Sequence, residues 1–124
     1  MCDIIKMYTI LQYRGAYDSF VASLEDKKLR AAVDQRLSRL AALGRNAGPK
    51  VSAPLRDGIF ECRAQRNRQQ ARILWFYVKN MRIIVTAGVI KERKVPPDLI
   101  DAAIDIKKTL EEHPELLNDL TEIH

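Results

Sequence analysis

The amino-acid sequence predicts an α+β domain in which an antiparallel sheet carries helices packed on one face. An apolar stripe with a 3.6-residue period marks a long helix in the first half. Three β-prone runs joined by short polar turns fill the second half, and an amphipathic helix follows them. With 124 residues, the chain is expected to form one domain, residues 1–124, that buries a hydrophobic core of its own.

The first half of the chain predicts one strand and two helices. Residues 4–12 are apolar and β-prone, and Gly15 ends that run. Asp18 can begin a short helix. A longer helix follows over residues 26–43, with Gly44 suited to the left-handed residue after its end. The apolar stripe of this longer helix consists of Leu29, Val33, Leu37 and Leu40.

The second half predicts three strands and two further helices. The strands span residues 59–64, 72–78 and 82–90, and short polar turns join them, so strands that are neighbours in sequence pair antiparallel. A Pro-Pro-Asp sequence starting at Pro96 opens a helix, and the chain restarts as a short helix at Pro114. The predicted order is therefore β-α-α-β-β-β-α plus a short C-terminal helix.

Positive charge is concentrated in the middle of the chain. Residues 45–94 contain 12 Lys and Arg against 3 Asp and Glu, whereas residues 95–124 contain 2 against 8. A small basic domain of this kind indicates an anionic partner, with nucleic acid as the first candidate. A solvated face that serves only solubility is the alternative. The acidic tail, residues 113–124, either folds back onto the basic block or faces a partner of its own.

Several common classes of site are missing from the sequence. It contains no glycine-rich phosphate loop and no zinc-binding histidine pair, and both histidines, His113 and His124, lie near the acidic end. We therefore expect no histidine-based nucleophilic site, no metal and no cofactor. No apolar run approaches the ~18–20 residues of a membrane span. The chain start lacks a signal-peptide pattern, and Cys2 and Cys62 are expected to be reduced thiols, which favours a cytoplasmic protein.

Charged residues at strand ends form the candidate site. Glu61 and Arg63 share one strand face, Arg72 opens the next strand, and Lys91 and Arg93 follow the last one. If these strands are neighbours, the cations converge, bind phosphate and stabilise a pentacovalent phosphate, while Glu61 accepts a proton. An ion pair on an exposed face is the alternative for Glu61 and Arg63. The further candidate RNA-binding residues are Lys50, Arg56, Arg66, Arg68 and Lys94.

The aromatic run at residues 75–77 is expected to belong to the core, because its strand is apolar on both faces. Such a run is also found in base-stacking platforms, which is the less favoured interpretation here. Tyr77 is the member expected to keep a polar tip near the site.

Four segments of the chain together resemble a known family. Residues 55–63 read L-R-D-G-I-F-E-C-R, residues 72–77 R-I-L-W-F-Y, residues 87–96 A-G-V-I-K-E-R-K-V-P, and residues 40–44 L-A-A-L-G. They are similar to the L-x-D-G-(I/L)-(Y/F)-E-x-R, Y-R-(I/V)-x-(Y/F)-x, H-G-F-x-K-K-x-x-x-(T/P)-P and L-x-x-L-G segments of the phage-derived, HigB-like toxins of the RelE superfamily. The resemblance covers about residues 18–112.

This resemblance implies a RelE-like fold and a toxin that cleaves mRNA, commonly on the ribosome. The reaction would be attack of a ribose 2′-hydroxyl on the adjacent phosphate, with no metal. The expected partner is a helix-turn-helix antitoxin encoded by an adjacent gene. Matching functional positions are occupied by Glu61, Arg63, Arg72 and Lys91, and Arg93 and Lys94 extend the basic end.

The chain also departs from the family pattern at four positions, the first of which is Ala71, where the family frequently has Tyr. The family often has His where this chain has Ala87, an aromatic residue where it has Val89, and a second lysine where it has Glu92. These departures keep a second interpretation open. The protein is then a catalytically weak or inactive RelE-like module that binds RNA, the ribosome or an antitoxin.

Overall fold

The computed structural model describes residues 7–90 and 94–123, with only the backbone described at Arg45. The strands are β1 (Thr9–Gln12), β2 (Ser52–Arg56), β3 (Ile59–Arg66), β4 (Gln69–Val78), β5 (Arg82–Ile90) and β6 (Thr121–Glu122). The helices are α1 (Ala16–Ser23), α2 (Lys27–Leu43) and α3 (Pro97–Glu112), with short 3-10 helices η1 (Gly44–Ala47) and η2 (Pro114–Asp119). The strands form one sheet in the order β2-β3-β4-β5-β1-β6. The α+β class is confirmed.

Helix α2 forms where the apolar stripe predicts it. The side chain of Asp26 accepts hydrogen bonds from the backbone N–H groups of Lys28 and Leu29, which satisfies two donors of the first turn. Gly44 ends the helix with φ 54°, and a Cβ there would come within 2.5 Å of the Tyr8 ring. All four stripe residues are buried. The predicted helix and its buried face are therefore confirmed.

Tight turns join the strands of the second half and set their antiparallel pairing. Asp57 and Gly58 have φ of 52° and 80° between β2 and β3, and Asn80 and Met81 have φ of 67° and 55° between β4 and β5. Two successive positive φ values match the right-handed twist of the flanking strands. Strand β2 is absent from the predicted order because its short sequence contains a proline, which only an edge strand tolerates.

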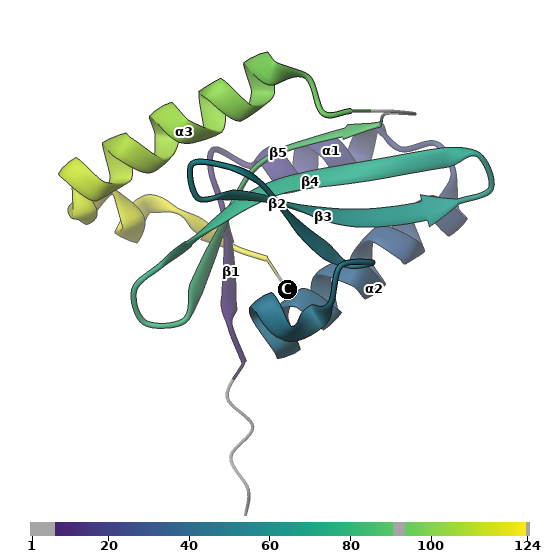
Figure 1. The fold of residues 1–124 in the computed structure, drawn as a ribbon, viewed down its shortest axis with the longest axis horizontal. Helices are drawn as coiled ribbons and strands as arrows, with labels where there is room; N and C mark the ends of the chain where they lie inside the picture. The colour runs from purple at the N-terminus through teal and green to yellow at the C-terminus, as the bar shows by residue number, and fades with distance from the viewer. Residues whose placement is uncertain (1–6, 91–93, 124) are drawn as a thin grey trace, which may run out of the picture.

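The prediction of an all-antiparallel sheet with helices on one face is wrong in two respects. Strand β1 pairs parallel with β5, since the chain leaves β1 through two helices before it returns to the sheet. Helices cover both faces, with α2 on one side and α3 on the other (Figure 1). Strand β4 contributes side chains to the hydrophobic cores on both faces of the sheet. Ile73 and Trp75 lie in the core under α1 and α2, and Leu74 and Phe76 lie in the core under α3.

The two ends of the chain also differ from the predicted elements. Strand β1 begins at Thr9 rather than at residue 4, and residues 4–6 lie outside the described residues. The expected short C-terminal helix is the 3-10 helix η2 followed by strand β6, which extends the sheet beyond β1. The N–H of Ile123 donates to the carbonyl of Ile10 at 2.8 Å, so sheet pairing replaces helix at this end.

Candidate functional site

Two arginines meet one buried carboxylate on the α3 side of the sheet. Arg63 Nε donates to Glu61 Oε1 at 2.8 Å, and Arg72 Nε lies 3.5 Å from Glu61 Oε2. The Glu61 side chain is only 6% exposed, against 14% for Arg72 and 41% for Arg63. The alternative of an exposed ion pair between Glu61 and Arg63 is therefore wrong, because the carboxylate is buried and contacts both guanidinium groups.

Strand register brings these side chains together. Arg63 of β3 lies directly opposite Arg72 of β4, and residues opposite one another in paired strands share a face. Glu61 lies two residues before Arg63 and so points to the same face. One further contact fixes Arg72, whose terminal Nη2 donates to Gln70 Oε1 at 2.6 Å. The convergence inferred from the sequence is confirmed for these three residues.

A pocket of about 410 Å³ opens beside the two arginines. It lies where β3 continues beyond Cys62, the last residue that pairs with β2. Its cations are Arg63 and Arg72 from the sheet, Lys50 from the loop before β2, and Arg36 from α2. The remaining lining residues are Ala64, Gln65 and Gln70, so no carboxylate of residues 7–90 and 94–123 lines the pocket.

Arg36 is the residue that the sequence interpretation missed. Its spacing from the buried residues Val33 and Leu40 is three and four, which places it at the border of the buried stripe. That border position is the signal that could have identified it.

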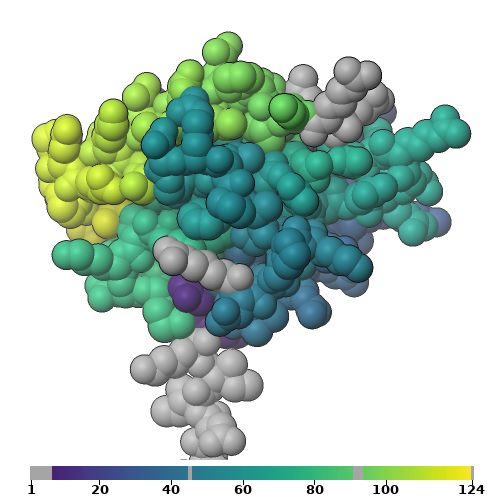
Figure 2. Space-filling model, in the orientation of Figure 1, coloured from purple at the N-terminus to yellow at the C-terminus, as the bar shows by residue number. Residues whose placement is uncertain are grey.

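The other candidate cations are distributed unevenly around this pocket. Arg66 and Arg68 are exposed at the β3–β4 turn, which projects from the body of the molecule (Figures 1 and 2). Lys94 is exposed just before α3. Lys91 and Arg93 lie outside the described residues, so their predicted place in the site stays a prediction.

Arg56 lies away from the pocket, at the opposite end of β3 from Arg63. It is next to the β2–β3 turn, where it pairs with Ile59. Its guanidinium contacts Asp101 of α3 and lies 3.2 Å from Asp57. The hydrogen bond with Asp101 raises the pKa of Arg56 above its usual value. The structure therefore does not bring Arg56 to the other candidate RNA-binding residues.

Small apolar side chains flank Arg72 on β5. A bulge between the Leu74 and Trp75 pairs places Val89 opposite Arg72 and Ala87 opposite Leu74, both on the face of the arginines. Gly88 faces the other way, where a Cβ would come within 2.3 Å of the Phe20 ring. His113 is the only histidine among the described residues, and it is exposed after α3. No imidazole of the described part of the chain therefore lies beside the arginines.

The aromatic residues of β4 belong to the core, as predicted for Trp75 and Phe76. Both have no exposed surface. The expectation that Tyr77 lies near the site is wrong, because Tyr77 packs with Tyr8, Phe60 and Trp75 on the face under α2. Tyr77 is an odd number of residues from Arg72, so the two side chains point to opposite faces.

Two buried groups of the core that α1 and α2 form with the sheet have raised pKa values. Burial raises the pKa of the free Cys62 thiol to about 12, an effect that the nearby Arg36 charge opposes. Burial also raises the pKa of Tyr17 above its usual range, and the hydrogen bond that Tyr17 donates to Asp34 adds to the shift. Both groups are therefore protonated at neutral pH.

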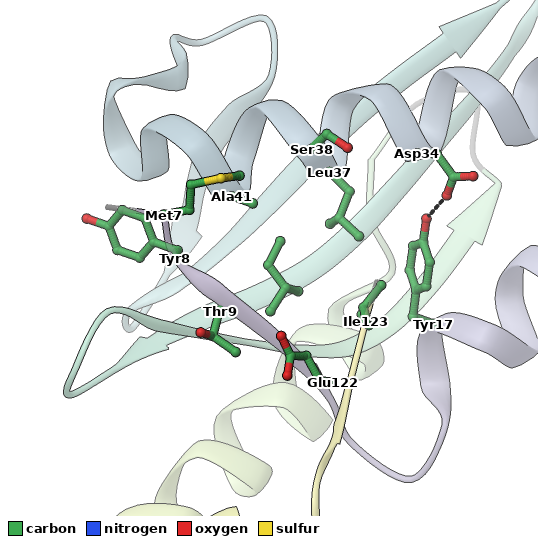
Figure 3. A pocket seen from close by; sticks show the side chains of 11 residues that line it. Met7, Tyr8, Thr9, Tyr17, Asp34, Leu37, Ser38, Ala41, Glu122 and Ile123 are labelled. Carbon is green, nitrogen blue, oxygen red and sulfur yellow. Dashed lines mark hydrogen bonds between the residues drawn. The ribbon is translucent and has the colours of Figure 1, made fainter. Parts of the chain in front are cut away.

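A second cavity, of about 440 Å³, lies between α2 and the β1–β6 edge (Figure 3). Its charged side chains are Asp34 and Glu122, and Tyr17 is hydrogen-bonded to Asp34 at its rim. None of the predicted site residues lines it. Its acidic character does not suit the anionic partner that the composition indicates.

Among the residues that the structure describes, no group of three His, Cys, Asp or Glu is arranged to hold a metal ion, and no helix is long and apolar enough to cross a membrane.

Comparison with known families identifies the chain. A search of curated proteins finds no match. The family model described as phage derived protein Gp49-like (DUF891) matches residues 20–108, which span β3 to β5 and all three arginines around the pocket. The chain belongs to this phage-derived, Gp49-like family of RelE-like, toxin-like proteins.

Proposed function

We propose that this protein is the HigB-like toxin of a toxin–antitoxin pair and that it cleaves mRNA on the ribosome, in the cytoplasm, without a metal. The observation that carries the proposal is the Glu61–Arg63–Arg72 cluster at the rim of a pocket lined by four cations. Membership of a toxin-like family is compatible with this role.

The chemistry of the proposed reaction suits these residues. Attack of a ribose 2′-hydroxyl on the adjacent phosphate forms a 2′-oxygen–phosphorus bond, releases the hydroxyl proton to water and adds negative charge to the phosphoryl oxygens. The bond to the 5′-oxygen of the next nucleotide breaks, and that oxygen takes a proton from water. Positively charged donors fixed in advance stabilise that charge. Glu61 contacts the Nε atoms of both arginines, which leaves the terminal nitrogens of Arg63 and the Nη1 of Arg72, whose Nη2 donates to Gln70, for a phosphate.

In this proposal Glu61 is a positioning residue and not the proton acceptor expected from the sequence. Its side chain is 6% exposed and each of its oxygens lies beside a guanidinium. A carboxylate held in this way orients the arginine forks and has little access to a ribose hydroxyl. Lys91 and Arg93, which follow β5, complete the proposed catalytic set on sequence grounds alone.

One observation favours a second candidate function. Ala87 and Val89 offer no proton donor or acceptor beside Arg72, where the toxin family often has His and an aromatic residue. A module that binds RNA or the ribosome without cleaving it would have the same cationic pocket. Cleavage therefore decides between the two functions.

The test is to add the purified protein to a reconstituted translation reaction and to map new mRNA 5′ ends. The wild type is compared with Arg72→Ala and with Arg56→Ala, a matched control that also removes one arginine. We expect new ends with the wild type and the control, and none with Arg72→Ala. Intact mRNA at every protein concentration, together with RNA binding that weakens steeply with salt, would overturn the nuclease and favour the binding module.

The partner is proposed to be a helix-turn-helix antitoxin encoded by the adjacent reading frame. Co-expression with the product of that frame should yield a stable complex and relieve growth arrest. A product that neither co-purifies nor relieves arrest would overturn this part of the proposal.

A further inference from the structure

The cations of the basic pocket fall into two pairs with different surroundings. Arg63 and Arg72 share the carboxylate of Glu61. Arg36 and Lys50 line the same pocket but make no ion pair with any carboxylate of the described residues. One half of the pocket is therefore partly neutralised, and the other half is not.

Arg36 is held on a rigid support. The helix that carries it is anchored by Val33 and Leu37, which are almost fully buried, and Arg36 itself is half-buried. The charge of Arg36 lowers the pKa of the nearby Cys62 thiol, against the larger effect of burial. A cation on a fixed support that pairs with no carboxylate of the described residues is available to hydrogen-bond an anionic ligand.

The charge and size of the pocket exceed what one phosphate requires. Four cations line it, and among the described residues Glu61, behind the rim, is the single carboxylate that forms ion pairs with them. Its volume of about 410 Å³ falls in the range of about 300–1,000 Å³ that is usual for small-molecule sites. Gln65 and Gln70 add side-chain amides that can hydrogen-bond a ribose or a base edge.

We infer that Arg36 and Lys50 form a second phosphate subsite, so that the ligand of this pocket is a nucleic-acid strand with two neighbouring phosphates. Arg63 and Arg72 bind one phosphate, and Arg36 and Lys50 bind the next. This inference rests on the proposed function for the identity of the strand as RNA. It goes further in naming Arg36 as a substrate-binding residue.

The experiment measures binding of short single-stranded RNA that carries a 2′-O-methyl group on every ribose, so that no 2′-hydroxyl is present and no cleavage can occur. In a series of these strands, each phosphate in turn is replaced by a neutral methylphosphonate. Affinities are measured by fluorescence anisotropy for the wild type, Arg36→Gln and Arg72→Ala. Arg39→Gln is the matched control, because Arg39 is an exposed cation on the same helix that does not line the pocket.

We expect two neighbouring linkages to weaken wild-type binding when neutralised, each by about tenfold. Arg36→Gln should abolish the penalty at one of them and Arg72→Ala the penalty at the other, whereas Arg39→Gln should retain both. The slope of log affinity against log salt concentration is negative, and it should become shallower by about 0.7 in Arg36→Gln. Arg36→Lys should retain that slope, and equal thermal midpoints establish that each variant is folded.

Three results would overturn the inference. Both variants could abolish the penalty at the same linkage, which would mean a single phosphate site. Arg36→Gln could behave as the wild type does. The wild type could fail to bind the strands but bind an acidic peptide that Arg36→Gln does not bind. The ligand of the pocket would then be a protein. If the wild type shows the two-linkage pattern but cuts no mRNA during translation, the subsite stands and the proposed nuclease fails.

Discussion

The two ends of strand β3 carry similar charges in opposite arrangements. At the β2–β3 turn, Arg56 contacts two exposed carboxylates, Asp57 and Asp101. At the other end, Arg63 and Arg72 share one buried carboxylate, and Arg36 and Lys50 lie close by with no ion pair to a carboxylate in the described part of the chain. The first end is neutralised and the second keeps an excess of positive charge.

This difference shows that position in the fold decides which cation is available to a ligand. Residue type does not distinguish Arg56 from Arg63, and both lie in the basic central block of the sequence. Helix α3 brings Asp101 to Arg56, whereas at the pocket end of β3 helix α2 contributes a further cation, Arg36, which lines the pocket. Screened, exposed ion pairs such as those of Arg56 contribute little to stability.

The largest effect is expected for Arg72→Ala at the pocket end. Removing one fixed cationic donor from a charge-stabilising site lowers the rate by about 10²–10³-fold. Arg72→Lys keeps the charge but loses the planar fork, so an intermediate rate is expected. The measurement is the yield of new mRNA 5′ ends with time, after circular dichroism has established that the variant is folded. A rate within twofold of the wild type would remove Arg72 from the site.

Glu61→Gln tests the carboxylate that orients the two arginines. It should lower the free energy of unfolding by about 2 kcal/mol, because two neighbouring guanidinium groups lose a charged acceptor. The kcat for cleavage should fall because the two arginines are no longer oriented. The affinity for an uncleavable strand should stay the same or rise, because the substitution removes one negative charge beside the pocket. Urea unfolding and single-turnover kinetics check the two parts. A fall in affinity with unchanged kcat would contradict the positioning role.

Cys62 gives a pH test of the core beneath the pocket. Burial raises its pKa from 9.0 to about 12, so the folded state keeps a proton that the unfolded state releases. Stability should therefore fall as pH rises from 9 towards 12, by up to about 1.4 kcal/mol per pH unit. Urea unfolding between pH 9 and pH 10 measures this slope. Cys62→Ala should flatten it, and an equal slope in both proteins would show that the thiol ionises normally.

Arg56→Ala should have the smallest effect. Its guanidinium lies at the neutralised end of β3, so mRNA cleavage is expected to stay within about twofold of the wild type. The same translation reaction provides the measurement. Asp101→Asn is the complementary change, since it frees Arg56 from its main partner. Loss of cleavage in Arg56→Ala comparable to that in Arg72→Ala would mean that the two ends do not differ in function.

Much of the fold follows from local sequence signals. The buried stripe from Leu29 to Leu40 and the short turn at Asn80 lie where the sequence predicts them. The parallel pairing of β1 with β5 is a contact between distant segments, and no local pattern encodes it. The apolar faces of β4 did indicate a sheet covered on both sides, which the prediction of helices on one face did not use.

The candidate site likewise contains one part that local sequence signals predict and one part that depends on contacts between distant segments. Alternation along β3 and the short turn to β4 predict that Glu61, Arg63 and Arg72 meet, because both signals are local. The roles of Arg36 and Arg56 depend on α2 and α3 packing against the sheet from opposite sides. Spacing within the sequence therefore could not separate the cation that lines the pocket from the one that pairs with Asp101.

The difference between the two ends of β3 can be observed directly at the arginine side chains. The Nε–H signals of ¹⁵N-labelled protein are recorded by NMR while an uncleavable single strand of RNA is added. The signals of Arg36, Arg63 and Arg72 should shift with a common affinity, and that of Arg56 should stay unchanged. Shifts confined to Arg56, or equal shifts at both ends, would contradict a phosphate-binding pocket at the Arg72 end.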